Sequence, residues 1–167
     1  DGDMEEGISH EACSLAGHLK LDKLVLFYDS NGITIEGHTE LALSDDPKKR
    51  FQAYNWHVLE IDGHDFDQID RAIRKATKVT GKPVIIICKT HIGKGSPNKQ
   101  DTHECHGAPL GEDEVKLTKT ALGFPPDQAF YVPQDVYTLF QERAAKMKRA
   151  QGKWRRVFKD WSKANPE

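Results

Sequence analysis

The chain has 167 residues, which is long enough for one α/β domain with a hydrophobic core. Charged residues make up 30% of the chain, but the formal net charge is only −2, so the basic excess of a nucleic-acid-binding protein is absent. No apolar run approaches the roughly eighteen residues of a membrane span, and no signal peptide is visible. The three cysteines have no paired spacing, which favours a reducing, cytoplasmic setting.

The first half of the chain alternates between helical and strand patterns. Apolar residues recur at helical spacing through 7–19, and a nearly continuous apolar run follows at Leu24–Tyr28, as in a parallel strand buried on both faces. Asn31-Gly32 is a turn signal, and an irregular segment is expected after it. The next elements expected are a helix over 47–54, a strand over 56–61, a helix over 66–79 and a strand over 83–88.

A long loop and a helical tail complete the chain. The loop, 90–111, is rich in Gly, Pro, His and Asn, and loops of this length inside a compact domain are usually functional or disordered. The last elements expected are a short helix over 112–122, a proline-containing linker over 123–133 and a polar, largely helical tail over 134–164.

The alternation of strands and helices predicts a parallel, right-handed α/β sheet, in which ligands lie outside the carboxyl ends of the strands. Asn31 follows the first strand and Thr90 follows the third, so both are expected at the ligand edge. The chain begins on Asp1 with no strand before it, and an α/β domain rarely starts at its own ligand loop. We therefore expect a piece of a longer protein.

Asp1 and Asn31 are candidate ligands of a hard cation. A carboxylate from Asp1, the amide oxygen of Asn31 and the backbone carbonyl of Ile33 would supply half of an octahedral Mg²⁺ shell, with phosphate oxygens and water completing it. Gly2 would let the backbone approach a phosphate, and the start of the following helix would favour that anion. An ordinary turn at each place is the alternative that spacing alone leaves open.

The loop His106 is the second candidate, since a histidine at the ligand edge can hydrogen-bond a diphosphate or a substrate oxygen. Zinc binding by the neighbouring His and Cys residues fits poorly, because no second Cys/His pair stands at a suitable distance. Residues 93–96 (GKGS) are similar to a phosphate cradle but lack the P-loop spacing, so they are a weak signal.

Five segments combine these signals: 1–11 (DGDMEEGISHE), 28–33 (YDSNGI), 61–65 (IDGHD), 88–99 (CKTHIGKGSPNK) and 106–111 (HGAPLG). Together they closely resemble the thiamine-diphosphate-binding region of transketolases. The resemblance covers essentially the whole chain, with two departures, His91 and Cys105. It implies a partial three-layer α/β/α fold with a mostly parallel sheet.

The resemblance also implies roles for single residues. Asp1, Asn31 and the carbonyl of Ile33 would hold Mg²⁺ or Ca²⁺. Gly2 and Asn31 would bind the cofactor, and His106 would contact both its diphosphate and the substrate, which makes His106 the catalytic residue of the set. Glu6 resembles an acid at the interface of a homodimer.

The implied reaction is transfer of a two-carbon ketol unit from a ketose phosphate to an aldose phosphate, with thiamine diphosphate as electron sink. The resemblance divides the chain into a diphosphate- and metal-binding α/β domain, 1–122, and a largely helical linker, 123–167, towards an absent pyrimidine-binding domain. The fragment is therefore expected to be inactive alone. Two alternatives remain: a dihydroxyacetone synthase or another thiamine-diphosphate enzyme, and a non-catalytic regulatory domain of the same fold.

Overall fold

The structure is a computed structural model that describes residues 1–166. The chain separates into two compact units, Asp1–Pro126 and Asp127–Glu167, and each is described by itself. The first unit carries all the strands found in the described residues and all the candidate site residues.

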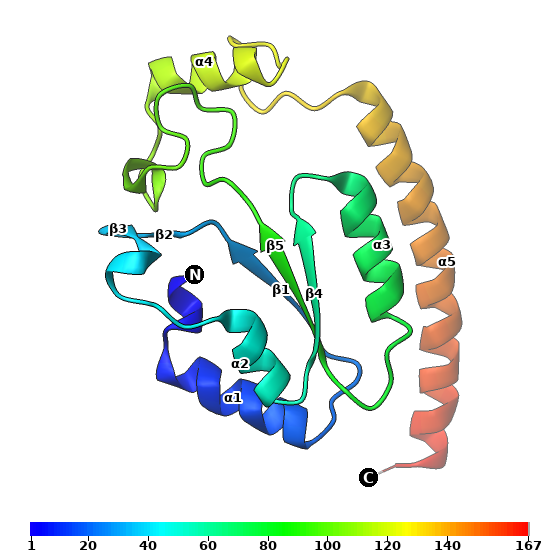
Figure 1. Cartoon of the computed structure of the whole chain (residues 1–167). Helices are drawn as coiled ribbons and strands as arrows, with labels where there is room; N and C mark the ends of the chain where they lie inside the picture. Colours follow the sequence, from blue (N-terminus) through cyan, green and yellow to red (C-terminus); the bar gives the residue numbers. More distant parts are fainter. Residues whose placement is uncertain (167) are drawn as a thin grey trace. The chain divides into compact units, whose positions relative to one another are not determined.

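A three-stranded parallel sheet forms the centre of the first unit. Its strands are β1 (Val25–Ser30), β4 (His57–Asp62) and β5 (Val84–Lys89), and β5 lies between the other two (Figure 1). Val84, Ile85, Ile86 and Ile87 of β5 are 0–5% exposed, since the central strand is covered on both faces. The parallel sheet predicted from the apolar runs is confirmed.

Helices cover both faces of this sheet and make three layers. On one face Ile85 and Ile87 pack with residues of α1 (Gly7–His18) and α2 (Pro47–Ala53). On the other face Val84 and Ile86 pack against Ala72 and Ala76 of α3 (Phe66–Ala76). Alternate residues of one strand thus face opposite layers, as the pleat requires. The predicted α/β/α fold is confirmed.

The sequence interpretation missed two kinds of short element. β2 (Ile33–Thr34) and β3 (Gly37–His38) form a small antiparallel hairpin, in which the chain reverses at Ile35-Glu36. Single turns of 3₁₀ helix occur at η1 (Gly2–Met4), η2 (Thr39–Leu41) and η3 (His103–Cys105). The helix predicted over 7–19 is α1, Gly7–His18, and the short turn η1 precedes it at Gly2.

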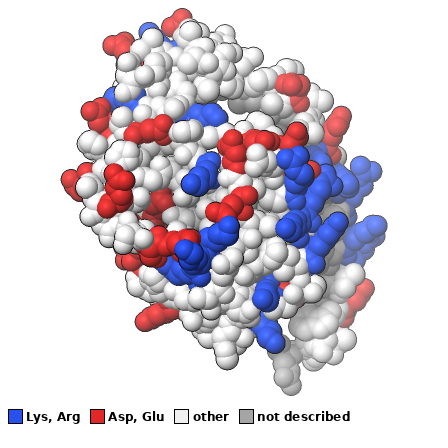
Figure 2. Space-filling model, in the orientation of Figure 1, with Lys and Arg blue, Asp and Glu red and all other residues white. Residues whose placement is uncertain are grey.

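The loop 90–111 leads into α4 (Glu112–Ala121), close to the predicted 112–122. In the face shown in Figure 2, acidic and basic side chains are interspersed over the region of α1 and α2, in keeping with the small net charge.

The second unit consists mainly of one long helix, α5 (Gln134–Ala164), of 31 residues. Its side chains are largely exposed, and Trp154, Phe158 and Trp161 stack along it with ring centroids 5.1 and 5.9 Å apart. Among the described residues, no helix has both the length and the apolar character to cross a membrane.

Candidate functional site

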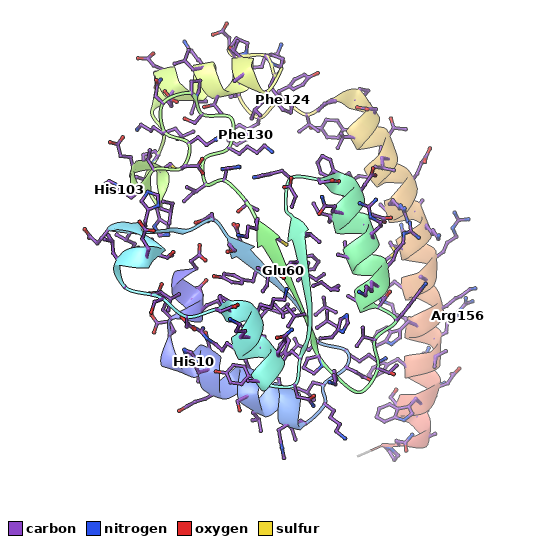
Figure 3. All side chains as sticks on the ribbon, in the orientation of Figure 1. His10, Glu60, His103, Phe124, Phe130 and Arg156 are labelled. Atoms are coloured by element: carbon purple, nitrogen blue, oxygen red, sulfur yellow. The ribbon has the colours of Figure 1, made fainter. Side chains whose placement is uncertain are left out.

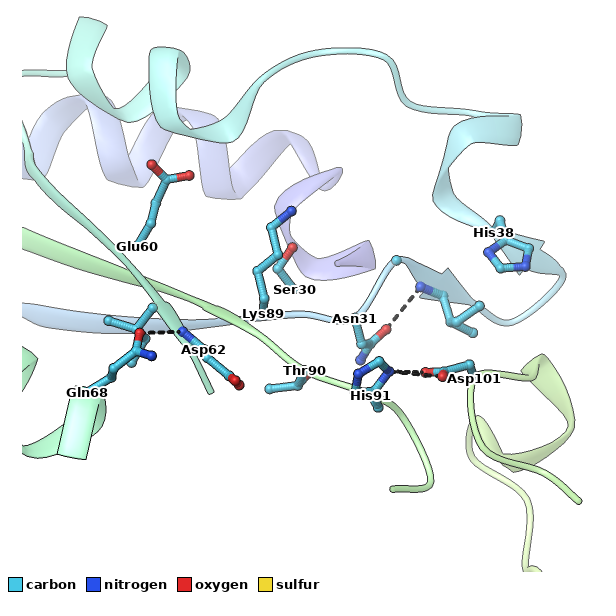
Figure 4. A pocket seen from close by; sticks show the side chains of 13 residues that line it. Ser30, Asn31, His38, Glu60, Asp62, Gln68, Lys89, Thr90, His91 and Asp101 are labelled. Atoms are coloured by element: carbon cyan, nitrogen blue, oxygen red, sulfur yellow. Dashed lines mark hydrogen bonds and ion pairs between the residues drawn. The ribbon is translucent and has the colours of Figure 1, made fainter. Parts of the chain in front are cut away.

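The carboxyl ends of the three parallel strands meet in one row. Ser30 pairs with Lys89, and Lys89 pairs with Asp62, so the strands end at the same level. A cleft of about 820 Å³ opens above this row and is lined by Asn31 and Thr90, among others. The location predicted for these two residues is confirmed. Asn31 and Thr90 point to one side of the strand ends, whereas Ser30 and Lys89 point to the other (Figure 4).

The Asp1 carboxylate is fastened to the turn that follows β1. Its Oδ2 accepts hydrogen bonds from the backbone N–H of Asn31 at 3.0 Å and of Gly32 at 2.6 Å. Its Oδ1 accepts a hydrogen bond from the hydroxyl of Tyr28. The structure thus brings together Asp1 and Asn31, which lie thirty residues apart in the sequence.

The turn itself holds the other two candidate oxygens in place. Asn31 Oδ1 accepts a hydrogen bond from the N–H of Ile33 at 2.9 Å, which fixes the side-chain amide over the turn. Gly32 adopts φ +75°, a conformation that favours glycine, and its carbonyl accepts from Thr39 N–H at 2.9 Å. Ile33 is only 3% exposed, so the backbone here is anchored in the protein.

A second cleft, of about 580 Å³, brings three further candidates together. Gly2, Glu6 and His106 all line it, although His106 reaches it through the long loop. The other lining residues are Asp3, Glu5, Thr34, Ile35 and Glu36. His106 is the only basic side chain among these described lining residues, beside four carboxylates. An anion at this cleft therefore needs positive charge from another source.

The long loop is held by a buried carboxylate that sequence reasoning missed. Glu114 of α4 is 8% exposed and accepts hydrogen bonds from the hydroxyl of Ser96 and from the backbone and side chain of Asn98, the last two at 2.9 and 2.8 Å. The bonds from Ser96 and Asn98 hold the pKa of Glu114 below its ordinary value. The pairing spans 18 residues and leaves no periodic signal in the sequence.

This network also corrects the weak phosphate-cradle signal at 93–96. The Ser96 hydroxyl donates to Glu114, and Ser96 itself is 3% exposed. A Cβ on Gly95 would lie 2.7 Å from Leu122 Cδ2, so this glycine permits close packing within the protein. The segment is a structural anchor of the loop.

His91, the first departure from the family pattern, is tied to two neighbours. Its Nδ1 lies 2.9 Å from the Asp101 carboxylate, and its ring stacks on His64 with centroids 5.7 Å apart. Its backbone N–H donates to His64 Nε2 at 2.9 Å. His91 lines the first cleft together with Asn31 (Figure 4).

Cys105, the second departure, contacts backbone carbonyls: its thiol lies 3.3 Å from Lys99 O and 3.2 Å from Thr102 O. Within the described residues, no group of three or more His, Cys, Asp or Glu side chains is placed to hold a metal ion. Cation binding here would have to use a mixed set of carboxylate, amide and backbone oxygens, the type of set that Mg²⁺ accepts.

This fold and this strand-edge arrangement define a three-layer α/β/α domain with a ligand cleft at the carboxyl ends of its parallel strands. The family profile described as "Transketolase, thiamine diphosphate binding domain" matches residues 1–167, so the chain belongs to the transketolase family. The predicted family is confirmed.

Similar proteins agree with this assignment. Transketolase 1 of Escherichia coli is 49% identical over 168 residues, covering 100% of this chain and 25% of its own length. Transketolase of Buchnera aphidicola subsp. Baizongia pistaciae is 58% identical over 140 residues, covering 82% of this chain and 21% of its own. The chain thus spans about a quarter of the length of the curated relatives it matches.

Solved transketolase structures share the fold. The enzyme from Pichia stipitis in complex with sedoheptulose-7-phosphate has a TM-score of 0.90 and 42% identity, covering 100% of this chain and 25% of that one. The enzyme from Campylobacter jejuni has a TM-score of 0.88 and 45% identity, covering 93% and 24%.

Proposed function

We propose that the full-length protein containing this chain is a transketolase that transfers a two-carbon ketol unit from a ketose phosphate to an aldose phosphate. It uses thiamine diphosphate and a divalent cation, Mg²⁺ or Ca²⁺. When bound, thiamine diphosphate supplies the electron sink for the carbanion chemistry, and the protein supplies positioning and electrostatics. The solved relative with sedoheptulose-7-phosphate supports sugar phosphates as the substrate class.

The observation that carries this proposal is the attachment of the Asp1 carboxylate to the Asn31-Gly32 turn. The attachment holds a carboxylate against the turn that carries Asn31 and leads directly into Ile33. The hydrogen bond from Ile33 N–H occupies one lone pair of Asn31 Oδ1, and an amide oxygen has two. These residues fit a cation that prefers oxygen ligands, so Asp1, Asn31 and Ile33 would hold the metal.

The second cleft fits the diphosphate end of the cofactor. Gly2 lines this cleft, and a Cβ placed on it would meet no atom within 4 Å, so the glycine borders open space. The backbone of Gly2 and the imidazole of His106 would bind the diphosphate, and His106 would also contact the substrate. Since carboxylates dominate the cleft, the divalent cation would have to offset their repulsion of a diphosphate.

Glu6 is exposed at the same cleft, which suits an acid that is covered by a second subunit. The proposal therefore includes a homodimer in which Glu6 lies at the interface. It also includes a cytoplasmic enzyme of the pentose phosphate pathway, in keeping with three free cysteines and a small net charge.

A cofactor titration of the full-length protein tests this function. Binding of thiamine diphosphate should require Mg²⁺ or Ca²⁺, and Asn31→Ala should weaken it by at least about tenfold, since even partners outside the metal shell commonly matter that much. Asn165→Ala, at the end of α5, is the matched control and should leave affinity unchanged.

Three results would contradict the proposal. Cofactor affinity that depends on neither the metal nor Asn31 would indicate a different site. An absence of cofactor binding would favour a non-catalytic domain of the same fold. A full-length protein that binds the cofactor but accepts only formaldehyde in place of an aldose phosphate would favour a dihydroxyacetone synthase.

A further inference from the structure

Tyr28 combines a buried ring with a hydroxyl at the candidate site. It belongs to β1 and is 4% exposed, and its ring lies in the core cluster that also contains Phe51, Trp56 and Ile85. A ring that is packed this closely inside a core has little freedom to change rotamer. Its hydroxyl donates a hydrogen bond to Asp1 Oδ1. A rigid part of the sheet therefore contacts the carboxylate directly.

The hydrogen bonds to the Asp1 carboxylate come from two different sources. The N–H groups of Asn31 and Gly32 bond Oδ2, but they belong to the same turn that carries the other candidate metal ligands. Tyr28 bonds the other oxygen, Oδ1, from within the sheet. Among the described residues the phenol is the one side-chain donor to this carboxylate, and with the two N–H groups it restricts the rotation of the carboxylate about its Cβ–Cγ bond.

The backbone beside Asp1 is anchored separately. Arg50 Nη1 donates to the carbonyl of Met4 at 2.9 Å, and Met4 packs against the same core cluster as Tyr28. The short turn η1 thus has its own support, and the carboxylate of Asp1 is oriented separately, by the Tyr28 hydroxyl together with the two N–H groups of the turn. The three hydrogen bonds occupy three of the roughly four lone-pair sites of the carboxylate, so its negative charge and one site on Oδ1 are left for a cation.

We propose that Tyr28 is a positioning residue for the cation site, holding the Asp1 carboxylate in the orientation in which it binds a divalent metal. The inference rests on the proposed function, in which Asp1 is a metal ligand. Partners that orient a ligand from outside the metal shell typically change metal affinity by about 10–100-fold. Removing the Tyr28 hydroxyl should therefore act on metal affinity more than on the fold.

The experiment uses the full-length protein freed of metal with a chelator. Mg²⁺ is titrated at a fixed, saturating concentration of thiamine diphosphate and followed by calorimetry, and the thermal midpoint of the metal-free protein is recorded in parallel. Tyr28→Phe keeps the ring and removes only the hydroxyl, so the Mg²⁺ dissociation constant should rise about tenfold or more while the metal-free midpoint changes little.

Tyr54→Phe is the matched control. Tyr54 packs against the same core cluster, but its hydroxyl bonds His10 Nδ1 at 2.9 Å and has no contact with Asp1 (His10 is labelled in Figure 3). This variant should bind Mg²⁺ as the wild type does. In an Asp1→Ala background, Tyr28→Phe should have no further effect, because the group that it orients is absent.

The outcomes separate the two proposals. If the wild type binds no metal, the proposed function fails and this inference fails with it. If the wild type binds and Tyr28→Phe binds equally well, the positioning role alone is overturned. It is also overturned if Tyr54→Phe weakens binding to the same degree, or if Tyr28→Phe keeps its full effect when Asp1 is alanine.

Discussion

His106 occupies an unusual electrostatic position for a residue proposed to bind a diphosphate. It is exposed, lies among carboxylates and is the single basic group among the described residues that line its cleft. A hydrogen bond to a charged group contributes about 1.5–3 kcal/mol, which corresponds to roughly ten- to a hundredfold in affinity. The imidazole should therefore matter for the cofactor even though the cation carries most of the charge.

We predict that His106→Ala in the full-length protein raises the dissociation constant of thiamine diphosphate at saturating Mg²⁺ by about tenfold or more. His103→Ala is the control: His103, labelled in Figure 3, is exposed in the same loop on η3. It is not among the residues that line the cleft. If the two variants lose cofactor affinity equally, the loop, and not the imidazole of His106, supports binding. Fluorescence quenching by the cofactor provides the measurement.

At single residues, the sequence predicted which groups could act and missed what holds them. The Asp1 and Asn31 pair was predicted from acid, amide and turn signals. Tyr28 was read as part of an apolar strand, because a tyrosine between apolar neighbours has the same pattern whether or not its hydroxyl has a partner. His91 was recognised only as a departure, and its contacts with Asp101 and His64 depend on how the loop returns to the sheet.

Among the helices, α1 offers a sharp test of packing. A Cβ on Gly17 would lie 1.7 Å from the carbonyl oxygen of Tyr54, a backbone atom that cannot move aside cheaply. An exposed glycine in a helix is usually improved by alanine, by about 0.5–1 kcal/mol. At Gly17 we expect the opposite, that alanine destabilises the protein.

We predict that Gly17→Ala lowers the free energy of unfolding by about 2 kcal/mol or more, as overpacking of a tight contact commonly does. Gly7→Ala, at the other end of the same helix, should be neutral or slightly stabilising, since its Cβ would meet nothing within 4 Å. Urea denaturation of both variants measures the difference. A stable Gly17→Ala protein would show that α1 can move away from Tyr54.

The attachment of the long loop to α4 should depend on pH. Hydrogen bonds in the folded state hold the pKa of Glu114 below the ordinary glutamate value of about 4.3. For a lowered pKa, the stabilisation is fully present above the unfolded value and is lost as the pH falls through the folded value. The loop should therefore be most firmly held at neutral pH and released in acid.

We predict that Glu114→Gln has a lower free energy of unfolding than the wild type at pH 7. The difference between the two should shrink as the pH falls below about 4.3. Glu112→Gln, exposed on the first turn of the same helix, should show a much smaller difference. Hydrogen exchange across 90–111 should rise in Glu114→Gln before the sheet is affected. If the difference in unfolding free energy between the wild type and Glu114→Gln does not change with pH, Glu114 acts through packing and not through its charge.

The secondary structure shows which elements a sequence pattern can reveal. The helices and the three parallel strands agree with their predicted ranges within a few residues, because each has enough length to show its periodicity. The β2–β3 hairpin was missed, since two-residue strands have no measurable period. The central place of β5 was not predicted either, because strand order depends on packing between elements that are distant in the sequence.

For the whole molecule, the exposed apolar surface of α1 is informative. Ile8 and Leu15 of α1 and Leu19, its C-cap residue, are 69%, 57% and 56% exposed, and their spacing places them on one face of the helix. Large apolar groups gathered in this way are typical of surfaces that another part of a protein or a second subunit covers. They support the proposal that a longer chain and a homodimer complete the active site around the residues described above.

The chain covers only part of the length of the transketolases that it matches, and this bears on what the chain can do alone. It spans about a quarter of the length of its curated relatives and holds the candidate cation and diphosphate contacts. The family resemblance implies that the glutamate which activates the aminopyrimidine of the cofactor lies in a separate domain, and nothing in 1–167 matches that domain. The isolated 167-residue chain should therefore show no ketol transfer from a ketose phosphate to an aldose phosphate at saturating thiamine diphosphate and Mg²⁺.

The full-length protein, assayed at the same molar concentration, is the positive control, and Asn31→Ala in the full-length protein sets the background of a weakened site. Turnover by the isolated chain above that background would mean that these residues complete catalysis by themselves, and that the division of the active site between domains is wrong for this protein.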